Sequence, residues 1–560
     1  MSLSSLLFRR AHRRNPSMPA PESTHTGADQ VADALQTLGV RHVFAIASIH
    51  NLPILRALHR RGFTEIVGMR HEQAAVHAAD AYARSGGGLG VAIASTGPGT
   101  ANTMGGLYEA SFANSRVLLI TGQTETYNLD KGKGALHEAE HQPEMLRSLC
   151  REVARPRRGG DIGDILLRLA RDVLTGRPQP AAVEIPIDMQ RGPCEQIELK
   201  PLEVPRDGVP DEHARRAAEL LASAERPLIY AGAGVNTSGA GPQLLALAEA
   251  TGIPVVTSRD GRGAIPEDHP QCLGGFATVR PLREYVESAD VVLAVGARFQ
   301  MLPTDAWRLR MPENLIHLDV DPTVIGRTYK AKLALAGDAA RGLEQIHAHL
   351  GSPARDHAEH LARGREAMAA ARQGISAEMG PDHEAICASI RRHLPRRSPV
   401  VRDATVPAYV YGDRVLPVYE PGSSIRPVGA AIGPGLPFAI GAATVTGLPT
   451  VLIQGDGGFM LSVGELASAA QAGAKVIVCL FNDKGYGVLR EILERQYGPP
   501  QDDVDLVAPD FEALARSFGI AAEKVADTAA FDAAFARAVE HDGPSLIEID
   551  MSALHPLQRA

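Results

Sequence analysis

Two acidic side chains in the last quarter of the chain, Asp456 and Asp483, have the spacing of a metal site. Asp456 lies in a Gly-Asp-Gly-Gly turn after an apolar run over residues 451–454, and Asp483 follows a second apolar run over residues 476–481. A helical stretch over residues 464–473 joins the runs, so we expect a βαβ unit whose two strands end at the same edge of a parallel sheet. Carboxylate oxygens at that edge suit a hard cation such as Mg²⁺, and the glycines let backbone N–H groups approach an anion. The segment therefore predicts a metal-bridged diphosphate site.

The same segment resembles the cofactor-anchoring motif of thiamine diphosphate (ThDP) enzymes, in which Gly-Asp-Gly is followed one βαβ unit later by an Asn or Asp pair and often by Tyr-Gly. Asn482-Asp483 and Tyr486 stand at those places in this chain. Asn is usual where Asp483 stands, and Asp is an acceptable, more anionic ligand for Mg²⁺. The alternative for the motif taken alone is an ordinary sheet turn with polar caps. The resemblance implies metal ligation by Asp456, Asp483 and the Gly485 carbonyl, and cofactor contacts by Asp456, Gly457, Gly458, Asp483 and Tyr486.

A second part of the resemblance lies near the start of the chain. Residues 70–84 read RHEQAAVHAADAYAR and residues 95–102 read STGPGTAN. They are similar to the HEQAA…ADGYAR and SGPGxxN signatures of the acetolactate synthase and benzoylformate decarboxylase branch. The resemblance implies that Glu72 is the carboxylate that activates the pyrimidine of the cofactor, and that Gly97 contacts the cofactor. Taken alone, Glu72 would be a favourable acid in the first turn of a helix.

Residues 430–442, AAIGPGLPFAIGA, look like the loop and helix start that support the cofactor in this family. The resemblance implies that Ala430 and Ile432 contact ThDP, with Ile432 as the apolar support of its V shape, although Met or Leu is commoner there. That shape brings the 4′-amino group close to C2, which is catalysis by positioning. Thr405 stands where the family often bonds the diphosphate.

Two histidines, His50 and His137, are candidate proton shuttles because an unperturbed histidine titrates near neutral pH. His50 falls where benzaldehyde lyase-like members hold a histidine, and His137 falls where lyases and synthases place a glutamine. Surface or packing histidines are the alternative, since the chain has 20 of them. Ser95 stands where benzoylformate decarboxylases carry a histidine, which weakens an assignment to that type. The residues expected to line the substrate pocket are Ile49, His50, Ser95, His137, Leu489 and Ile492, of which the last two could instead be helix-core residues.

The alternation of short apolar runs with helical stretches predicts an α/β fold of three consecutive doubly wound parallel-sheet domains. Strands are expected at residues 42–46, 90–94, 117–121, 182–185, 227–231, 254–257, 291–295 and 315–319, besides the two runs named above. In family order the domains are a pyrimidine-binding domain (27–190), a middle domain (191–352), a linker helix (353–379) and a diphosphate-binding domain (380–560), after a leader or disordered extension (1–26). The Gly232-Ala-Gly234 turn lacks a complete GxGxxG and predicts a tight βα turn rather than an NAD site.

Bulk composition narrows the class of partner. The 65 acidic and 57 basic residues give a net charge of −8 without a long basic run, which argues against nucleic acid. Five scattered cysteines without CxxC predict free thiols in a reducing compartment, and hence a cytoplasmic protein. Apolar runs stay shorter than a membrane span, so we expect no membrane partner.

The resemblance implies an active site between the first domain of one subunit and the third domain of its partner, in a homodimer or dimer of dimers. It implies a ThDP- and Mg²⁺-dependent enzyme that decarboxylates a 2-oxo acid to an enamine and ligates it to an aldehyde or ketone, as acetolactate synthases do. The alternative reaction is decarboxylation that releases an aldehyde. A ThDP-fold subunit without turnover and an NAD-dependent dehydrogenase are alternatives of other classes. FAD in the middle domain is possible by analogy with the synthases, but no residue requires it.

Overall fold

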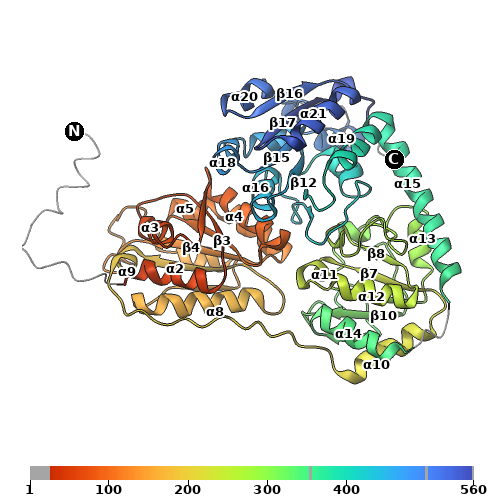
Figure 1. Ribbon diagram of the computed structural model, residues 1–560, viewed down its shortest axis with the longest axis horizontal. Helices are drawn as coiled ribbons and strands as arrows, with labels where there is room; N and C mark the ends of the chain where they lie inside the picture. Colours follow the sequence, from red (N-terminus) through yellow and green to blue (C-terminus); the bar gives the residue numbers. More distant parts are fainter. Residues whose placement is uncertain (1–24, 352–355, 499–501, 558–560) are drawn as a thin grey trace, which may run out of the picture.

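The computed structural model describes residues 25–351, 356–498 and 502–557, which form three lobes with one parallel sheet in each (Figure 1). Most of the expected N-terminal extension and the start of the expected linker helix lie outside the described residues. The three-domain α/β fold predicted from the sequence is confirmed. Within the described residues, every helix is too short or too polar to cross a lipid bilayer.

The first sheet has the order β2-β1-β3-β4-β6-β5, and all its strands are parallel. Its central strands are buried throughout because helices cover both faces, as in other parallel sheets. The chain order reverses between β1 and β3, and ligands of such sheets bind at the carboxyl edge beside that reversal. Its strands are β1 (His42–Ala45), β2 (Glu65–Gly68), β3 (Gly90–Ala94), β4 (Val117–Gln123), β5 (Glu152–Ala154) and β6 (Ala181–Pro186). Its helices are α2 (Gly27–Thr37), α3 (Leu52–Arg61), α4 (Glu72–Tyr82), α5 (Pro98–Asn102), α6 (Met104–Ala113), α7 (Gln142–Arg147), α8 (Ile162–Leu174) and α9 (Ile187–Arg191).

The third sheet, β13-β12-β14-β15-β17-β16, repeats the strand order of the first, with its reversal between β12 and β14. Its strands are β12 (Val400–Arg402), β13 (Ser424–Ile425), β14 (Thr450–Gly455), β15 (Val476–Asn482), β16 (Ala521–Val525) and β17 (Ser545–Asp550). Its helices are α16 (Gly435–Thr446), α17 (Asp456–Met460), α18 (Glu465–Ala472), α19 (Gly487–Gln496), α20 (Phe511–Ser517) and α21 (Thr528–Glu540). The two reversal points therefore lie next to the two sets of motifs found in the sequence.

The middle sheet has the order β11-β10-β9-β7-β8. Its strands are β7 (Pro227–Ala231), β8 (Val255–Thr257), β9 (Val291–Val295), β10 (Asn314–Asp319) and β11 (Leu333–Ala336), and its main helices are α10 (Asp211–Ser223), α11 (Ala233–Ser238), α12 (Gly241–Thr251), α13 (Leu282–Glu287) and α14 (Ala339–Leu350). Helix α15 (Ala358–His393), which bends at Gly380, runs along the outer side of the molecule from this lobe to the C-terminal lobe (Figure 1).

The first and third domains pack directly against each other through α4 and α16. A Cβ on Gly441 of α16 would lie 2.0 Å from the carbonyl oxygen of Ala78 in α4, so the two helices approach with only a hydrogen between them. His77 meets the ring of Phe438 edge to face, with ring centroids 5.3 Å apart. This contact holds the two cofactor-binding domains of one chain in a fixed relation.

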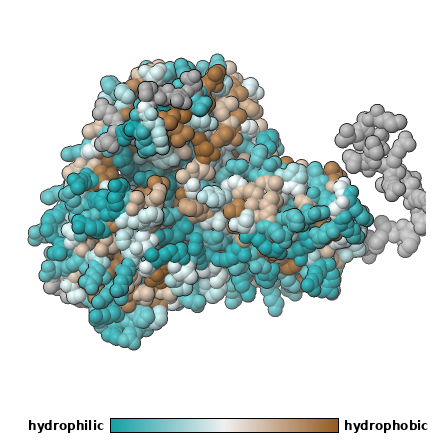
Figure 2. All heavy atoms as spheres, turned by 180° about the vertical axis from the view of Figure 1, so that it is seen from behind, coloured by the Kyte–Doolittle hydropathy of each residue, from teal (hydrophilic) through white to brown (hydrophobic). Residues whose placement is uncertain are grey.

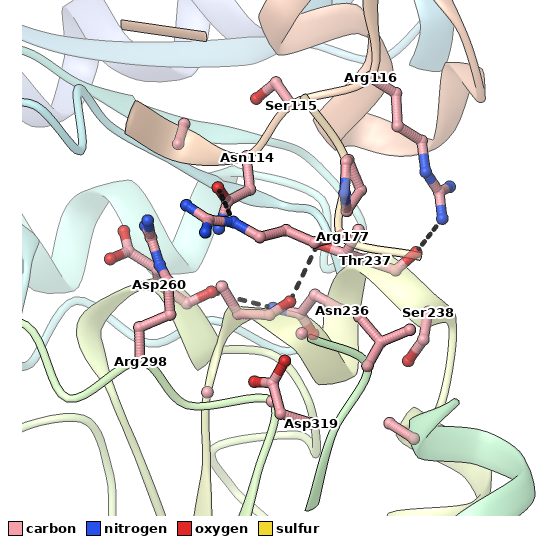
Figure 3. A pocket seen from close by; sticks show the side chains of 18 of the residues that line it. Asn114, Ser115, Arg116, Arg177, Asn236, Thr237, Ser238, Asp260, Arg298 and Asp319 are labelled. Atoms are coloured by element: carbon pink, nitrogen blue, oxygen red, sulfur yellow. Dashed lines mark hydrogen bonds between the residues drawn. The ribbon is translucent and has the colours of Figure 1, made fainter. Parts of the chain in front are cut away.

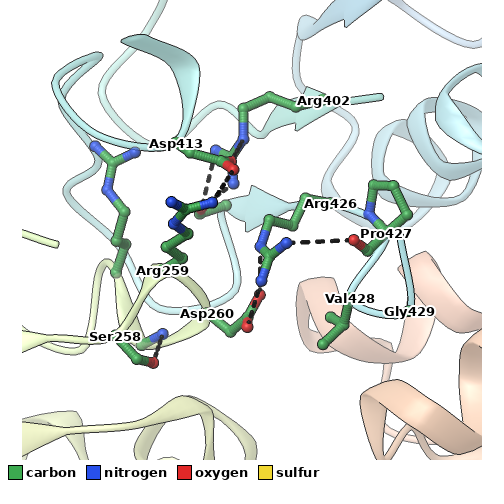
Figure 4. A network of polar contacts seen from close by, with 12 residues as sticks. Ser258, Arg259, Asp260, Arg402, Asp413, Arg426, Pro427, Val428 and Gly429 are labelled. Carbon is green, nitrogen blue, oxygen red and sulfur yellow. Dashed lines mark hydrogen bonds and ion pairs between the residues drawn. The ribbon is translucent and has the colours of Figure 1, made fainter. Parts of the chain in front are cut away.

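A buried network of charges joins the middle and third domains (Figure 4). Arg426 pairs with Asp260 at 2.8 Å, and Arg402 pairs with Asp413 at 2.7 Å. Arg262 donates to Glu267 and to two carbonyl groups of the third domain. Because each charge is paired and bonded inside the protein, the network fixes how the domains meet.

Candidate active site

The metal half of the site is built by Asp456 and Asp483 at the carboxyl edge of the third sheet. Asp456 is the first residue of α17 and Asp483 follows β15, so neighbouring strands bring the two side chains together. One Asp456 oxygen, Oδ1, is buried without a hydrogen-bond partner. The two carboxyls are close enough to affect each other: burial, and then the charge of Asp456, raises the pKa of Asp483 to about 7.

These two carboxyls fit a divalent cation. Two adjacent carboxylates repel unless a proton or a cation lies between them, and Mg²⁺ takes one or two carboxylates together with phosphate oxygens. Among the described residues, no three His, Cys, Asp or Glu side chains gather into a metal cluster. The remaining oxygens would therefore come from the backbone and from a ligand, as at a metal-bridged diphosphate.

The segment after β15 covers the Gly-Asp-Gly-Gly turn. A Cβ on Gly457 would lie 2.7 Å from the Tyr486 ring and 3.3 Å from the carbonyl oxygen of Gly485. Asn482 is engaged elsewhere, because its amide donates to Glu548 at 2.9 Å and its oxygen accepts from the N–H of Lys484 at 3.1 Å. Asp483, rather than Asn482, is thus the member of the pair that reaches Asp456.

A buried carboxylate, Asp403, organises the other side of the turn. It follows β12 and accepts hydrogen bonds from the N–H groups of Gly433 (3.1 Å) and Gly435 (2.9 Å) and from the amide of Gln454 (2.7 Å). Burial raises the pKa of Asp403 to about 6. The loop held in this way places Ile432, which is 39% exposed, 3.3 Å from the Cβ position of Gly458.

Thr405 and Ala430 complete this half. The hydroxyl of Thr405 lies 2.9 Å from the Cβ position of Gly455, beside the start of the turn. Ala430 has a φ of +62°, a left-handed backbone that an alanine adopts only where its surroundings hold it. Thr405, Ile432 and Tyr486 therefore lie around one turn, and Ala430 stands two residues before Ile432 in the same loop.

The other half of the site is built by Glu72 and the loops of the first domain. Glu72 is the first residue of α4, and its Oε2 accepts a hydrogen bond of 3.0 Å from Asn102. Its Oε1 lies 3.1 Å from the Cβ position of Gly99. Gly97 has a φ of +58°, and a Cβ there would lie 2.6 Å from the carbonyl oxygen of His137. Glycines at 97 and 99 thus let the turn after β3 approach both Glu72 and the His137 loop.

His50 and His137 face each other in this half, with ring centroids 5.4 Å apart. Nδ1 of each ring is buried without a hydrogen-bond partner. Burial, reinforced by the charge of His137, lowers the pKa of His50. Ser95 lies beside them, with its hydroxyl 2.5 Å from that of Ser48. The lowered pKa favours the neutral form of the His50 ring.

The structure groups the predicted residues into two sets within one chain. Glu72, His50, Ser95, Gly97 and His137 gather in the first domain with the exposed side chain of Ile49. The residues predicted to bind the metal, the diphosphate and the ring system gather in the third domain. Among the described residues, no hydrogen bond or ion pair joins Glu72 to Asp456 or Asp483. Leu489 and Ile492 are 49% and 38% exposed on α19, so they are not core residues of this chain.

Sequence reasoning did not find Asp403 or Gln142. Gln142 is buried and accepts from the N–H of Gly97 at 2.9 Å, while its amide donates to the buried Glu184 at 2.9 Å. Asp403 follows an apolar run just as Asp456 does, and that similarity could have indicated it. Gln142 carries no such signal, because its partners are distant in the sequence.

A separate cavity of about 640 Å³ lies where the three domains meet (Figure 3). Arg116 and Arg177 of the first domain, Arg298 and Asp319 of the middle domain, and Val428 of the third line it. It opens beside the Gly232 turn, at the reversal between β7 and β9, where ligands of such sheets bind. The residues predicted to bind ThDP do not line it.

Comparison with known proteins agrees with this arrangement. Three family models match: the N-terminal TPP binding domain of thiamine pyrophosphate enzymes over residues 25–145, their central domain over 214–346 and their C-terminal TPP binding domain over 408–549. The chain is 33% identical to the probable 2-ketoarginine decarboxylase of Pseudomonas aeruginosa, with 94% of each chain covered. It is 30% identical to the probable acetolactate synthase large subunit of Methanocaldococcus jannaschii, over 93% of this chain and 91% of that one. It is 29% identical to the acetolactate synthase isozyme 3 large subunit of Escherichia coli, over 88% of each.

Thiamine pyrophosphate is another name for ThDP. The matched domains follow the order of the three sheets, and the relatives align over nearly the whole chain. The chain therefore belongs to the thiamine pyrophosphate enzymes.

Proposed function

We propose that this enzyme binds ThDP through Mg²⁺, decarboxylates a 2-oxo acid and joins the remaining acyl unit to an aldehyde or ketone. The observation that carries the proposal is the adjacent carboxyl pair Asp456 and Asp483 at the carboxyl ends of β14 and β15, with Gly485 and Tyr486 against the Gly-Asp-Gly-Gly turn. The relatives named as acetolactate synthases support the ligating reaction.

The residues of the chain have distinct tasks in this proposal. When bound, ThDP supplies a carbon nucleophile and an electron sink for the loss of CO₂. Asp456, Asp483 and the Gly485 carbonyl would hold Mg²⁺, and Thr405, Gly457 and Gly458 would hold the diphosphate. Ile432 and Ala430 would orient the ring system, and Glu72 would hold a proton against the pyrimidine nitrogen. His50 and His137 would move protons at the substrate oxygen, beside Ile49 and Ser95.

A second copy of the chain would complete the site. Apolar side chains that flank the two halves, including Ile49, Ile432, Leu489 and Ile492, are exposed in one chain. Figure 2 shows apolar side chains on the outer surface of the C-terminal lobe. We therefore propose a homodimer or dimer of dimers, in which Leu489 and Ile492 cover the substrate bound at the first domain of the partner.

Decarboxylation with release of an aldehyde is the second candidate. The neighbouring rings of His50 and His137 favour it, because a proton delivered after CO₂ loss gives an aldehyde. The relative named as a probable 2-ketoarginine decarboxylase supports it too. The competing outcomes differ only in what captures the acyl unit, so products distinguish them.

The test is a mass-spectrometric screen of products with ThDP and Mg²⁺ supplied. Pyruvate, branched, aryl and guanidino 2-oxo acids are offered as donors, with and without an aldehyde or 2-oxo acid acceptor. A 2-hydroxy ketone that needs the acceptor supports ligation, and an aldehyde formed equally in both arms supports the second candidate. The Glu72→Gln variant should bind ThDP and turn over far more slowly, while Glu212→Gln on an exposed face of α10 should match the wild type.

Three further proposals accompany this function. FAD is a candidate ligand of the three-domain cavity, and flavin absorbance of the purified protein decides whether it is present. The five cysteines are free thiols, which supports a reducing, cytoplasmic location. We also propose the domain limits expected from the sequence, with the linker helix forming part of α15.

A further inference from the structure

A buried glutamate of the third domain holds the segment that leads into α4 of the first. Glu465, in α18, accepts hydrogen bonds from the N–H groups of Arg70 (3.1 and 3.2 Å) and His71 (3.0 Å). Ser468 also donates to it at 2.6 Å, and the side chain is almost wholly buried. The residue after His71 is Glu72. The third domain thus reaches across to the backbone that sets the position of Glu72.

A buried glutamate of the first domain does the same to the third. Glu109, in α6, is fully buried and accepts from the N–H groups of Val428 (2.5 Å) and Gly429 (3.0 and 3.1 Å). The residue after Gly429 is Ala430, which has the left-handed backbone noted above, and Ile432 follows two residues later. The first domain thus holds the loop that presents the apolar support of the cofactor.

The two contacts are counterparts. Helix α4 follows β2 in the first sheet and α16 follows β13 in the third, and these strands have the same place in the two strand orders. In each case a carboxylate from the other domain accepts two consecutive N–H groups just before the residues expected to meet ThDP. Burial raises the pKa of each of these glutamates, and the backbone hydrogen bonds counteract that effect.

Each carboxylate accepts hydrogen bonds from two consecutive backbone N–H groups of its segment. Hydrogen bonds from backbone N–H groups to a carboxylate are stronger than those between neutral groups. Loss of the acceptor leaves two backbone N–H groups without this partner, and the loss is most costly at the buried Val428. The contact between α4 and α16 does not depend on them, since it is formed by close helix approach and by His77 with Phe438. Removal of one carboxylate should therefore loosen one segment and leave the domains docked.

We propose that Glu109 and Glu465 are reciprocal positioning residues. Each belongs to one cofactor-binding domain and fixes the segment of the other domain that contacts the cofactor. Glu465 positions Glu72, and Glu109 positions Ala430 and Ile432. This inference rests on the proposed function for its effect on ThDP, but the backbone effect is independent of any ligand.

The first arm of the test measures amide hydrogen exchange in the protein without cofactor, for Glu465→Gln and Glu109→Gln. Oε1 of each glutamate accepts from both backbone N–H groups. A glutamine keeps the shape and one acceptor oxygen but removes the charge, so the charge-assisted bonds become weaker bonds to a neutral amide. Exchange should rise by about ten- to a hundredfold in residues 69–73 for Glu465→Gln and in residues 427–433 for Glu109→Gln. The control is Asp321→Asn, whose carboxylate pairs with Arg177 at 3.2 Å across a different domain contact and should leave both segments unchanged.

The second arm measures the cofactor. Glu109→Gln should raise the Kd for ThDP with Mg²⁺ by about tenfold, and Glu465→Gln should slow deuterium exchange at C2 of bound ThDP by a similar factor while the Kd changes less. Where a glutamine variant does not fold, the aspartate variant at that position is measured instead. The same increases in amide exchange and the same changes in ThDP binding and C2 exchange are expected.

Wild-type exchange rates in both segments would overturn the proposal, and so would loosened segments with unchanged ThDP binding and C2 exchange. Failure of the wild type to bind ThDP would instead refute the proposed function and leave the first arm as the test.

Discussion

Replacement of Gly97 by alanine tests how the first half of the site is assembled. Gly97 has φ +58° and ψ −114°, a conformation that costs a residue with a side chain about 1–3 kcal/mol. The new methyl group would also lie 2.6 Å from the carbonyl oxygen of His137, and relief of such a contact costs about 1–3 kcal/mol more. The expected destabilisation of the loop is therefore about 2–6 kcal/mol, with His137 displaced from His50.

The matched control is Gly134→Ala, in the loop that carries His137. Gly134 has a φ of +71° with no atom within 4 Å of its Cβ position, so it bears only the left-handed backbone cost of about 1–2 kcal/mol. A three-domain chain need not unfold in one step, so the measurement is local: amide exchange of residues 134–142. We expect Gly97→Ala to exceed the control by about 2 kcal/mol, roughly thirtyfold in the opening equilibrium. Equal exchange in the two variants would show that the close contact with His137 does not constrain this loop.

Three further outcomes follow from the site. Glu72→Gln should lower turnover by about a hundredfold or more with ThDP still bound, as kinetics and calorimetry together would show, and unchanged turnover would remove Glu72 from its proposed role. The apparent affinity for Mg²⁺ should fall by about tenfold per pH unit below pH 7, because the ion must displace the proton that the raised pKa of Asp483 retains. In Mg²⁺ titrations the Asp483→Asn variant should show a weaker pH dependence. An equally steep dependence in that variant would contradict the role of Asp483. His50 has a lowered pKa, so it contributes stability that is present above its unfolded pKa near 6.5 and lost as the pH falls toward the folded value; thermal melts of His50→Gln should therefore lose less stability in acid than those of the wild type.

Local motifs made much of the site predictable. The residues around Asp456 and Asp483 are one βαβ unit, so their convergence follows from strand direction alone. The central strands were predictable too, since β3, β4, β7 and β9 are unbroken apolar runs buried on both faces.

The features that the sequence did not predict depend on contacts between distant segments. Strands β2, β5, β11, β12, β13, β16 and β17 were not expected. Five of them lie at sheet edges, where half-exposed residues such as those of Glu65–Gly68 break the apolar pattern, whereas β12 and β17 lie inside the third sheet. No motif marked Glu109 or Glu465, and their bonding partners lie more than 300 residues away in the sequence, in the other domain.

The repeated strand order explains why one chain carries two unlike halves of a site. The loop after the first strand of each sheet holds His50 in one case and Thr405 in the other, and the loop after the third strand holds Gly97 and Asp456. The loop after the second strand leads to Glu72 in the first domain and to Ile432 in the third. One set of positions thus carries the proposed acid–base groups in the first domain and the proposed metal, diphosphate and apolar contacts in the third. Helices α4 and α16 form the contact between the two domains of one chain. In the dimer that we propose, the two halves of a site would meet through a second copy of the chain, and each chain would contribute to two sites.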